Sequence, residues 1–221
     1  MRGFDREKLM GVLSDGIDEM DLPLWAAQRE QLMDYLALMV KWNGVYNLTS
    51  LRDPGQMVTH HLLDSLAAVP AFVDAKNVLD VGAGGGLPGI VLAIARPDVQ
   101  VSLIDTVHKK TAFLTQVKAE LGLKNVTVYT MKVQELKAGP FDVITSRAFA
   151  DLSDFVNWSG HLLSEGGQFI ALKGTAPSEE QERLPAAWKI RELRALKVAK
   201  LEAERHLVFI EKAIERAAQT T

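Results

Sequence analysis

The stretch Lys76–Ile94, KNVLDVGAGGGLPGIVLAI, joins two apolar runs through a glycine-rich loop. Residues 77–81 are short, apolar and rich in branched side chains, which predicts a strand, and the pattern of residues 87–96 predicts a helix. Glycines let the loop turn sharply and let a ligand approach the backbone. The helix that follows directs free N–H groups and the positive end of its dipole toward the loop. This order predicts a nucleotide-type pocket.

The type of nucleotide depends on the frame in which the glycines are counted. The dinucleotide spacing G-x-G-x-x-G is matched from Gly84, two residues beyond the strand end, whereas counting from Gly82 puts Leu87 in the third glycine's place. Asp80 in the strand followed by G-x-G-x-G instead resembles motif I of the class I S-adenosylmethionine methyltransferases. The alternative role for Asp80 is a cap for the loop amides. The residues of this stretch predicted to bind the methyl donor are Asp80, Gly82, Gly84, Gly86 and Leu87.

Composition limits the class of protein. The chain has 221 residues, 48% of them hydrophobic, which suffices for one sizeable core and an extension. We expect a cytoplasmic protein without a membrane partner, because no apolar run reaches membrane-spanning length and the early Asp5 and Glu7 do not fit a signal peptide. The absence of cysteine excludes disulfides, Cys-ligated metals and a cysteine nucleophile, and with it pyrimidine C5 methylation through a cysteine adduct.

The net charge of −3 argues against a global field that attracts nucleic acid. Residues 77–150 carry 8 basic and 6 acidic side chains and form the net positive segment of the chain. Any contact with nucleic acid is therefore expected to be local.

The N-terminal region reads as helical. Apolar spacing predicts helices over 4–20, 23–42 and 56–73, with a shaped loop at 42–50. The last of these helices carries His60 and His61, which as neighbours on a helix point about 100° apart and cannot share one metal ion. Packing and surface roles are expected for both.

The remainder alternates strands and helices. Helices are expected at 108–121 and 151–163, a short helix or loop at 177–182, and a helical tail at 213–221. Strands are expected at 99–104, 126–129, 141–146, 168–173, 189–198 and 205–210. This pattern predicts an α/β fold with a Rossmann-like sheet, mostly parallel with an antiparallel C-terminal strand, plus an N-terminal helical extension.

Four motifs in this order, WN-x-x-YNLTS, H-x-LDSL, DVGAGGGLPGI and SRAFA, resemble the bacterial small-subunit ribosomal RNA methyltransferase G family, also called the glucose-inhibited division protein B family. The resemblance covers nearly the whole chain. It implies a class I enzyme that methylates N7 of a guanine in 16S rRNA of the small ribosomal subunit, near the decoding site, and converts S-adenosylmethionine to S-adenosylhomocysteine. It also implies an N-terminal extension at 1–75, a catalytic domain at 76–212 and a tail at 213–221.

Further site residues are expected at strand ends. Asp105 ends the second strand, where an acid commonly accepts hydrogen bonds from ribose; the alternative is a helix cap. The resemblance places Gln134 and Glu135, in the predicted loop at 133–136, against the adenine. Arg147, after the fourth strand, is expected to face the donor or the substrate. Its alternative is an ion pair with one of three carboxylates, Asp80, Asp105 or Asp142.

Lysines supply the expected RNA contacts. Lys109 and Lys110 open a helix, where positive charge opposes the dipole, and Lys173 ends a strand. Solvated lysines are the alternative. The fourth strand lacks the N/D-P-P-Y/F motif of enzymes that methylate exocyclic amines of adenine or cytosine, which makes amine methylation less favoured. We expect a monomer that needs no metal.

The proposed acceptor determines the mechanism. Guanine N7 has a lone pair and no proton, so no base is needed, and Arg147 is expected to position or stabilise reacting groups. His60 and His61 are not expected to act as bases. The competing hypotheses are a small-molecule methyltransferase, an NAD-dependent oxidoreductase and a non-catalytic S-adenosylmethionine-binding regulator.

Overall fold

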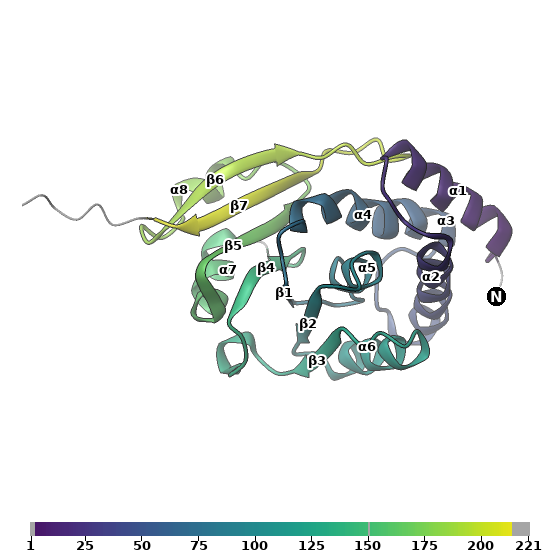
Figure 1. The fold of residues 1–221 in the computed structure, drawn as a ribbon, viewed down its shortest axis with the longest axis horizontal. Coiled ribbons are helices and arrows are strands. Elements are labelled where there is room, and N and C mark those ends of the chain that lie inside the picture. Colours follow the sequence, from purple (N-terminus) through teal and green to yellow (C-terminus); the bar gives the residue numbers. More distant parts are fainter. Residues whose placement is uncertain (1–2, 150, 214–221) are drawn as a thin grey trace, which may run out of the picture.

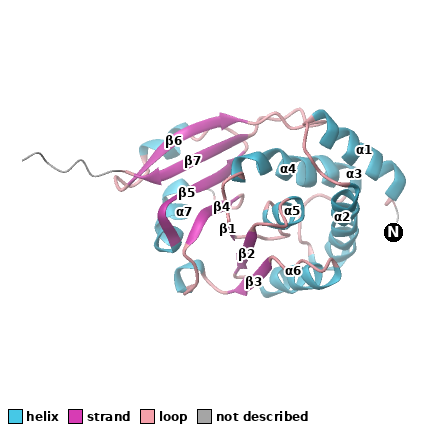
Figure 2. Ribbon diagram, in the orientation of Figure 1, coloured by secondary structure: helices cyan, strands magenta, loops and turns pink. Residues whose placement is uncertain are grey.

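A seven-stranded sheet runs through the molecule in the order β3-β2-β1-β4-β5-β7-β6 (Figures 1 and 2). The structure is a computed structural model that describes residues 3–149 and 151–213. Strands β1 to β5 are parallel, and β7 lies antiparallel between β5 and β6. The strands are β1 (Asn77–Val81), β2 (Gln100–Asp105), β3 (Val126–Thr130), β4 (Phe141–Ser146), β5 (Leu163–Lys173), β6 (Trp188–Ala195) and β7 (His206–Lys212).

Helices cover both faces of the sheet and bury two hydrophobic clusters. Leu13, Tyr35 and Phe113 belong to the larger cluster, under helices α1, α2 and α6. Phe155 of α7 belongs to the smaller cluster, on the opposite face. The α-helices are α1 (Arg6–Glu19), α2 (Ala26–Tyr46), α3 (Pro54–Met57), α4 (Asp64–Ala68), α5 (Gly89–Ala95), α6 (His108–Glu120), α7 (Leu152–Ser159) and α8 (Ser178–Glu182).

Side-chain alternation explains why β1 lies in the interior of the sheet, with a strand on each side. Val78 packs into the larger cluster and Leu79 into the smaller one, and both are completely buried. A strand that is apolar on both faces fits a parallel sheet with helices on each side. The predicted fold class is confirmed by this architecture.

Some predicted boundaries were wrong. Helix α5 begins at Gly89, and Leu87 and Pro88 lie in the preceding turn. Strand β5 begins at Leu163, five residues before the predicted start, because Leu163 pairs with Phe141 across an irregularity in the ladder. Strand β6 ends at Ala195, three residues before the predicted end. The predicted loop at 133–136 contains a 3₁₀ turn, Val133–Glu135.

The predicted helix at 56–73 is present with a changed geometry. Between α3 and α4 the chain forms a π-helix, Val58–Leu63, and a 3₁₀ turn, Val69–Phe72, continues α4. A π-turn widens the helix by one residue per hydrogen bond and shifts the side chains that follow it. The predicted helical tail at 213–221 lies, apart from Ala213, outside the described residues.

The N-terminal helices pack directly on the glycine loop. The Tyr35 hydroxyl donates a hydrogen bond of 2.5 Å to the carbonyl oxygen of Gly85. Tyr35 is completely buried, so this bond satisfies a polar atom that burial would otherwise leave unpaired. The division into an extension at 1–75 and a domain at 76–212 stays a prediction.

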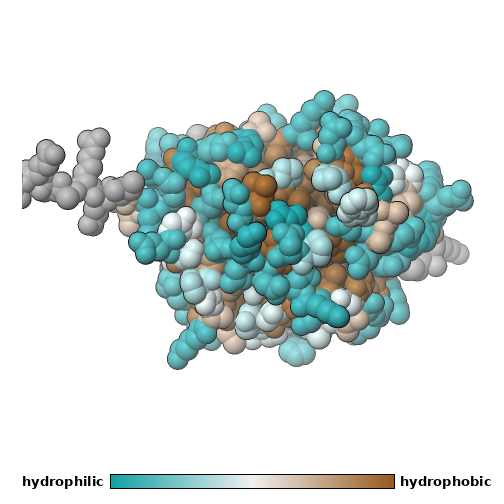
Figure 3. All heavy atoms as spheres, viewed as in Figure 1, coloured by the Kyte–Doolittle hydropathy of each residue, from teal (hydrophilic) through white to brown (hydrophobic). Residues whose placement is uncertain are grey.

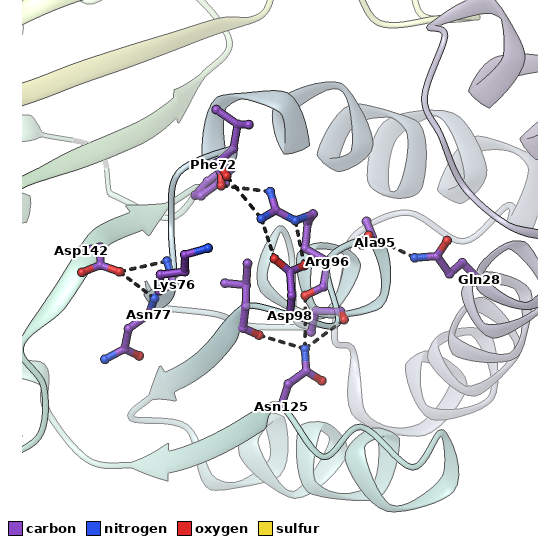
Figure 4. Close-up of polar contacts among 12 residues, drawn as sticks. Gln28, Phe72, Lys76, Asn77, Ala95, Arg96, Asp98, Asn125 and Asp142 are labelled. Carbon is purple, nitrogen blue, oxygen red and sulfur yellow. Dashed lines mark hydrogen bonds and ion pairs between the residues drawn. The ribbon is translucent and has the colours of Figure 1, made fainter.

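Polar contacts hold the edge at which the parallel strands begin (Figure 4). Asp142 Oδ2 accepts hydrogen bonds from the backbone N–H groups of Lys76 and Asn77, both at 2.9 Å. The Asn125 amide donates to carbonyl oxygens of Ala93 and Val99, both at 3.0 Å. The contacts of Asp142 and Asn125 belong to the edge opposite the glycine loop.

In the view of Figure 1, hydrophilic residues cover most of the surface and hydrophobic residues show between them (Figure 3).

Candidate active site

The strand order reverses at β1, and the predicted site residues gather at the edge where the parallel strands end. Strand β2 lies on one side of β1 and β4 on the other. In open α/β sheets, ligands bind at such a switch point, beyond the carboxyl ends of the strands. The glycine loop follows β1, Asp105 ends β2 and Arg147 follows β4. The structure thus brings together residues from three parts of the sequence.

Asp80 is a buried carboxylate with one unpaired oxygen. Its Oδ2 accepts a hydrogen bond of 2.8 Å from the Gly89 N–H group, whereas Oδ1 has no hydrogen-bond partner among the described residues. Burial raises the pKa of Asp80 to about 7, opposed by the Gly89 hydrogen bond and the charge of Arg147. The capping role therefore accounts for one oxygen. The other is enclosed by the protein and unpaired, an arrangement that a nearby positive charge or hydrogen-bond donor would stabilise.

The glycines of the loop serve different purposes. A Cβ on Gly86 would lie 2.5 Å from Ile90, and one on Gly89 would lie 2.2 Å from Leu103, so both positions need glycine for packing. Gly84 has φ +57°, and a Cβ there would meet nothing closer than the Gly82 oxygen at 3.8 Å. The loop is therefore open above Gly84, where a ligand can approach the backbone.

Asp105 braces the same loop. Its Oδ2 accepts from the Gly84 N–H group at 3.0 Å, and its Oδ1 accepts from the Val107 N–H group at 2.8 Å. Among the described residues, helix α6 has no side-chain cap, because the Val107 N–H group precedes its first residue. A carboxylate offers about four lone-pair sites, so Asp105 can hold both loop N–H groups and still accept from a ligand. Lys110 Nζ lies 3.8 Å from Asp105 Oδ2, which ties this lysine to the loop.

Arg147 forms a different ion pair from those considered in the sequence. Its Nη1 lies 3.3 Å from Asp64 Oδ2, and none of the three carboxylates considered earlier is within ion-pair distance of it. Asp142 faces the start of β1 instead, at the other end of the strands. Arg147 therefore points from the end of β4 toward α4.

Asp64 also binds Arg205, the residue before β7. Arg205 Nε donates to Asp64 Oδ1 at 2.7 Å. Strand β7 runs antiparallel to β5, so its first residue, His206, lies opposite Lys173 at the end of β5. A cavity of about 250 Å³ opens at this edge. It is lined by Asp64, Arg147, Leu172, Lys173, Gly174, Leu196, Arg205 and His206.

The remaining predicted residues lie in different surroundings. Gln134 and Glu135 are exposed on the 3₁₀ turn after β3, and Leu87 is mostly buried. Lys109 is exposed at the start of α6. Lys173 is only 12% exposed and forms an ion pair of 2.7 Å with Glu180. Lys109, Lys110 and Lys173 therefore do not form a single solvent-facing patch.

The two histidines are held by local hydrogen bonds. His61 is buried, with Nε2 at 2.9 Å from the Thr49 hydroxyl and Nδ1 at 3.1 Å from the carbonyl oxygen of His60. Burial, followed by the charge of Arg147, lowers the pKa of His61 to about 4. His60 Nδ1 lies 2.8 Å from the Thr59 hydroxyl. Among the residues that the structure describes, no three His, Cys, Asp or Glu side chains are grouped to hold a metal ion.

Sequence reasoning did not identify Asp64, Arg205 or Tyr35 as site residues. Asp64 stood in the H-x-LDSL motif without a role, and Arg205 was read as the start of a closing strand.

No described helix is long and apolar enough to cross a membrane.

Comparisons with known proteins agree with this geometry. Residues 28–208 match the family model described as rRNA small subunit methyltransferase G. A protein named ribosomal RNA small subunit methyltransferase G from Herminiimonas arsenicoxydans is 68% identical, over 96% of this chain and 100% of that relative. One of the same name from Janthinobacterium sp. (strain Marseille) is 67% identical, over 97% and 100%.

The fold also occurs in a solved methyltransferase. The O-methyltransferase TomG from Streptomyces achromogenes, determined with S-adenosylmethionine, superposes with a TM-score of 0.59 and 16% identity, covering 95% of this chain and 99% of that one. At this identity the likeness supports the fold alone.

Proposed function

The chain belongs to the rRNA small subunit methyltransferase G family, and on that premise we propose that its acceptor is N7 of a guanine in 16S rRNA, near the decoding site of the small ribosomal subunit. Membership makes the chain an S-adenosylmethionine-dependent methyltransferase of small-subunit rRNA. The matched residues, 28–208, include the glycine loop, Asp105, Arg147 and Arg205. The position of the methyl group on the base is the part that we add.

The residues at the switch point fit the methyl donor. S-adenosylmethionine supplies an electrophilic methyl group on a positively charged sulfur. The unpaired Oδ1 of Asp80 suits a positively charged or hydrogen-bond-donating partner, and the opening above Gly84 leaves room for a ligand against the backbone. We assign the ribose contact to Asp105 and the adenine contact to Gln134 and Glu135.

The proposed acceptor removes the need for a catalytic base. Guanine N7 carries a lone pair and no proton, so the protein has to align the reacting atoms and exclude competing orientations. Arg147 cannot accept a proton and is assigned a positioning or electrostatic role. His61 is a poor candidate for a base, because both ring nitrogens have partners and its pKa is lowered to about 4.

The charge distribution favours recognition of a preformed RNA shape. The chain is net acidic, and of the three lysines proposed to bind RNA, Lys110 and Lys173 have acidic neighbours. A small patch that includes Lys109 contacts phosphates in this proposal, and the particle supplies the remaining specificity. A monomeric, cytoplasmic protein is the form that we expect to act on it.

The observation that carries the proposal is the pair of carboxylates, Asp80 and Asp105, around an open glycine loop in a chain of this family. The test incubates the protein with donor labelled in the methyl group and with small subunits from cells that lack this enzyme. We expect label in 16S rRNA, and transfer to be lost in Arg147→Ala. Donor binding without transfer would favour a regulator, and label in small molecules alone would favour the alternative substrate class.

A further inference from the structure

Asp64 connects two arginines that come from distant parts of the chain. Its Oδ2 lies 3.3 Å from Arg147 Nη1, and its Oδ1 accepts a hydrogen bond of 2.7 Å from Arg205 Nε. The Asp64 side chain is 7% exposed, whereas those of Arg147 and Arg205 are 27% and 24% exposed. The carboxylate is therefore buried behind two guanidinium groups that reach the surface.

Both guanidiniums keep donors that no described residue uses. Arg147 uses Nη1 for Asp64 and for a 3.5 Å contact with the carbonyl oxygen of His60. Arg205 uses Nε for Asp64 and Nη1 for the carbonyl oxygen of Glu204. Neither Nη2 atom has a hydrogen bond to a residue that the structure describes. Since each guanidinium has five N–H donors, both can bind a further acceptor.

These donors belong to one cavity. Asp64, Arg147 and Arg205 all line the cavity of about 250 Å³ at the ends of β4 and β5. One carboxylate between two guanidiniums leaves a net positive charge on the group. Arginine binds phosphate through parallel N–H groups in a fixed geometry, so two arginines held by one carboxylate form a phosphate-binding arrangement.

The local fold fixes where Asp64 lies. Asp64 is the first residue of α4 and follows directly on the π-helix Val58–Leu63. Such π-turns occur frequently at functional sites, because they redirect the side chains that follow. His61, within the π-helix, is anchored to the Thr49 hydroxyl at 2.9 Å. The carboxylate is thus held by a rigid segment that faces the cavity.

We propose that Asp64 is a positioning residue for the acceptor RNA, which holds Arg147 and Arg205 so that their free N–H groups bind a backbone phosphate beside the target nucleotide. The inference rests on the proposed function for the identity of the RNA. The structural alternative is that Asp64 serves stability alone, by neutralising two partly buried arginines. The two roles differ in what removal of the negative charge does to RNA binding.

The test measures binding of the full-length protein to small ribosomal subunits by co-sedimentation, with S-adenosylhomocysteine present. Asp64→Asn removes a negative charge close to the RNA, so an effect of charge alone would strengthen binding. Positioning predicts the opposite, a loss of affinity of about tenfold, because the arginines are no longer held in register. Binding that is unchanged or tighter in the folded variant would overturn the proposal.

Two further variants separate positioning from stability. Asp142→Asn makes the same change at the opposite edge of the sheet, where the carboxylate accepts two backbone N–H groups. It is expected to lower the melting temperature and leave subunit binding unchanged. Arg205→Gln is expected to weaken binding about tenfold, and Asp64→Asn added to it should cost no more than about twofold further, since both act through one arrangement.

The binding readout also separates this inference from the proposed function. Subunits that bind in an Asp64-dependent manner without accepting methyl groups would support the inference and contradict the proposed acceptor. Methyl transfer to 16S rRNA, together with wild-type affinity for subunits in both Asp64→Asn and Arg205→Gln, would support the proposed function and contradict the inference. If Asp64→Asn fails to fold, Arg205→Gln alone decides, and wild-type affinity in that variant overturns the proposal.

Discussion

Asp80 is expected to couple donor binding to pH. The pKa of this carboxyl is raised to about 7 in the donor-free protein, chiefly by burial and also by the charge of Asp105, while the Gly89 N–H group and Arg147 act in the opposite direction. S-adenosylmethionine carries positive charge, so it binds better when Asp80 is ionised. About half of the molecules are ionised at pH 7 and about one in a hundred at pH 5.

The size of the effect follows from these fractions. If donor binds the ionised form, its affinity should fall about 50-fold from pH 7 to pH 5, roughly 2 kcal/mol. Stability should change in the opposite sense. Because the folded-state pKa of Asp80 is raised above its unfolded value, its contribution to stability is fully present below about pH 4 and is lost as pH rises through about 7.

The perturbation is Asp80→Asn, which keeps an oxygen for the Gly89 N–H group and removes the titration. We expect the variant to bind donor more weakly than wild type at pH 8, to lose the pH dependence of binding, and to melt at a higher temperature at pH 8. Weaker binding in a more stable protein cannot come from misfolding.

The assay is calorimetric titration of donor between pH 5 and pH 8, in buffers of different ionisation enthalpy, which reports the protons released. Wild type should release nearly one proton near pH 6. Asp98→Asn is the control, because the Arg96 hydrogen bond lowers the pKa of Asp98 to about 2 and leaves it ionised throughout. Wild-type affinity that is constant from pH 5 to pH 8, or an Asp80→Asn protein that keeps the dependence, would refute the reasoning.

Three other outcomes are expected. Gly84→Ala and Gly122→Ala place an alanine at φ +57° and +64°, each at a cost of about 1 kcal/mol, but only Gly84→Ala adds a methyl group in the donor loop. Donor affinity should fall at least about tenfold in Gly84→Ala and stay unchanged in Gly122→Ala. Equal donor affinities in the two variants would contradict this. With donor and subunits saturating, the rate of single-turnover methyl transfer should vary less than about threefold between about pH 6 and 9 in wild type, His60→Ala and His61→Ala. The rate in Arg147→Ala should be at least about tenfold lower at every pH. A tenfold rise in rate that follows one deprotonation and disappears with a histidine change would show that a base is needed. Intact small subunits should be methylated at least about tenfold faster than naked 16S rRNA or random guanine-containing oligonucleotides, because a net acidic protein recognises shape; equal rates on all three would refute recognition of the particle.

Local sequence patterns predicted the strand, loop and helix around Gly84. Branched apolar residues, clustered glycines and a helical period all favoured the same structure there. The same is true of the mostly parallel sheet, because alternating strands and helices favour parallel strands whose carboxyl ends share one edge. Asp80, Asp105 and Arg147 met at that edge for this reason.

Contacts between distant residues were not predictable in this way. Asp64 lies 83 residues from Arg147 and 141 residues from Arg205 in the sequence, and no local pattern specifies either pair. The π-helix before Asp64 is likewise a tertiary feature, since residues 58–63 read as an ordinary helix. The interpretation of Lys173 as an RNA contact did not foresee its ion pair with Glu180, which depends on how α8 packs.

Backbone conformation was a second gap. A valine at Gly84 would place a branched side chain in the donor loop, but φ +57° makes a β-branched residue strained there, so loss of binding could not be separated from strain. Gly84→Ala, with Gly122→Ala as its control, is therefore the better test of the loop.

Identifying the methylated atom is the most direct test of the proposed acceptor. Small subunits from cells lacking the enzyme are incubated with donor and protein, and the extracted 16S rRNA is reduced with borohydride and treated with aniline, which cleaves the chain at 7-methylguanosine. We predict one new cleavage in 16S rRNA, at a guanine near the decoding site, that requires both wild-type protein and donor. Methyl groups incorporated into the rRNA without a new cleavage would place the modification on another atom and contradict the proposed N7 acceptor.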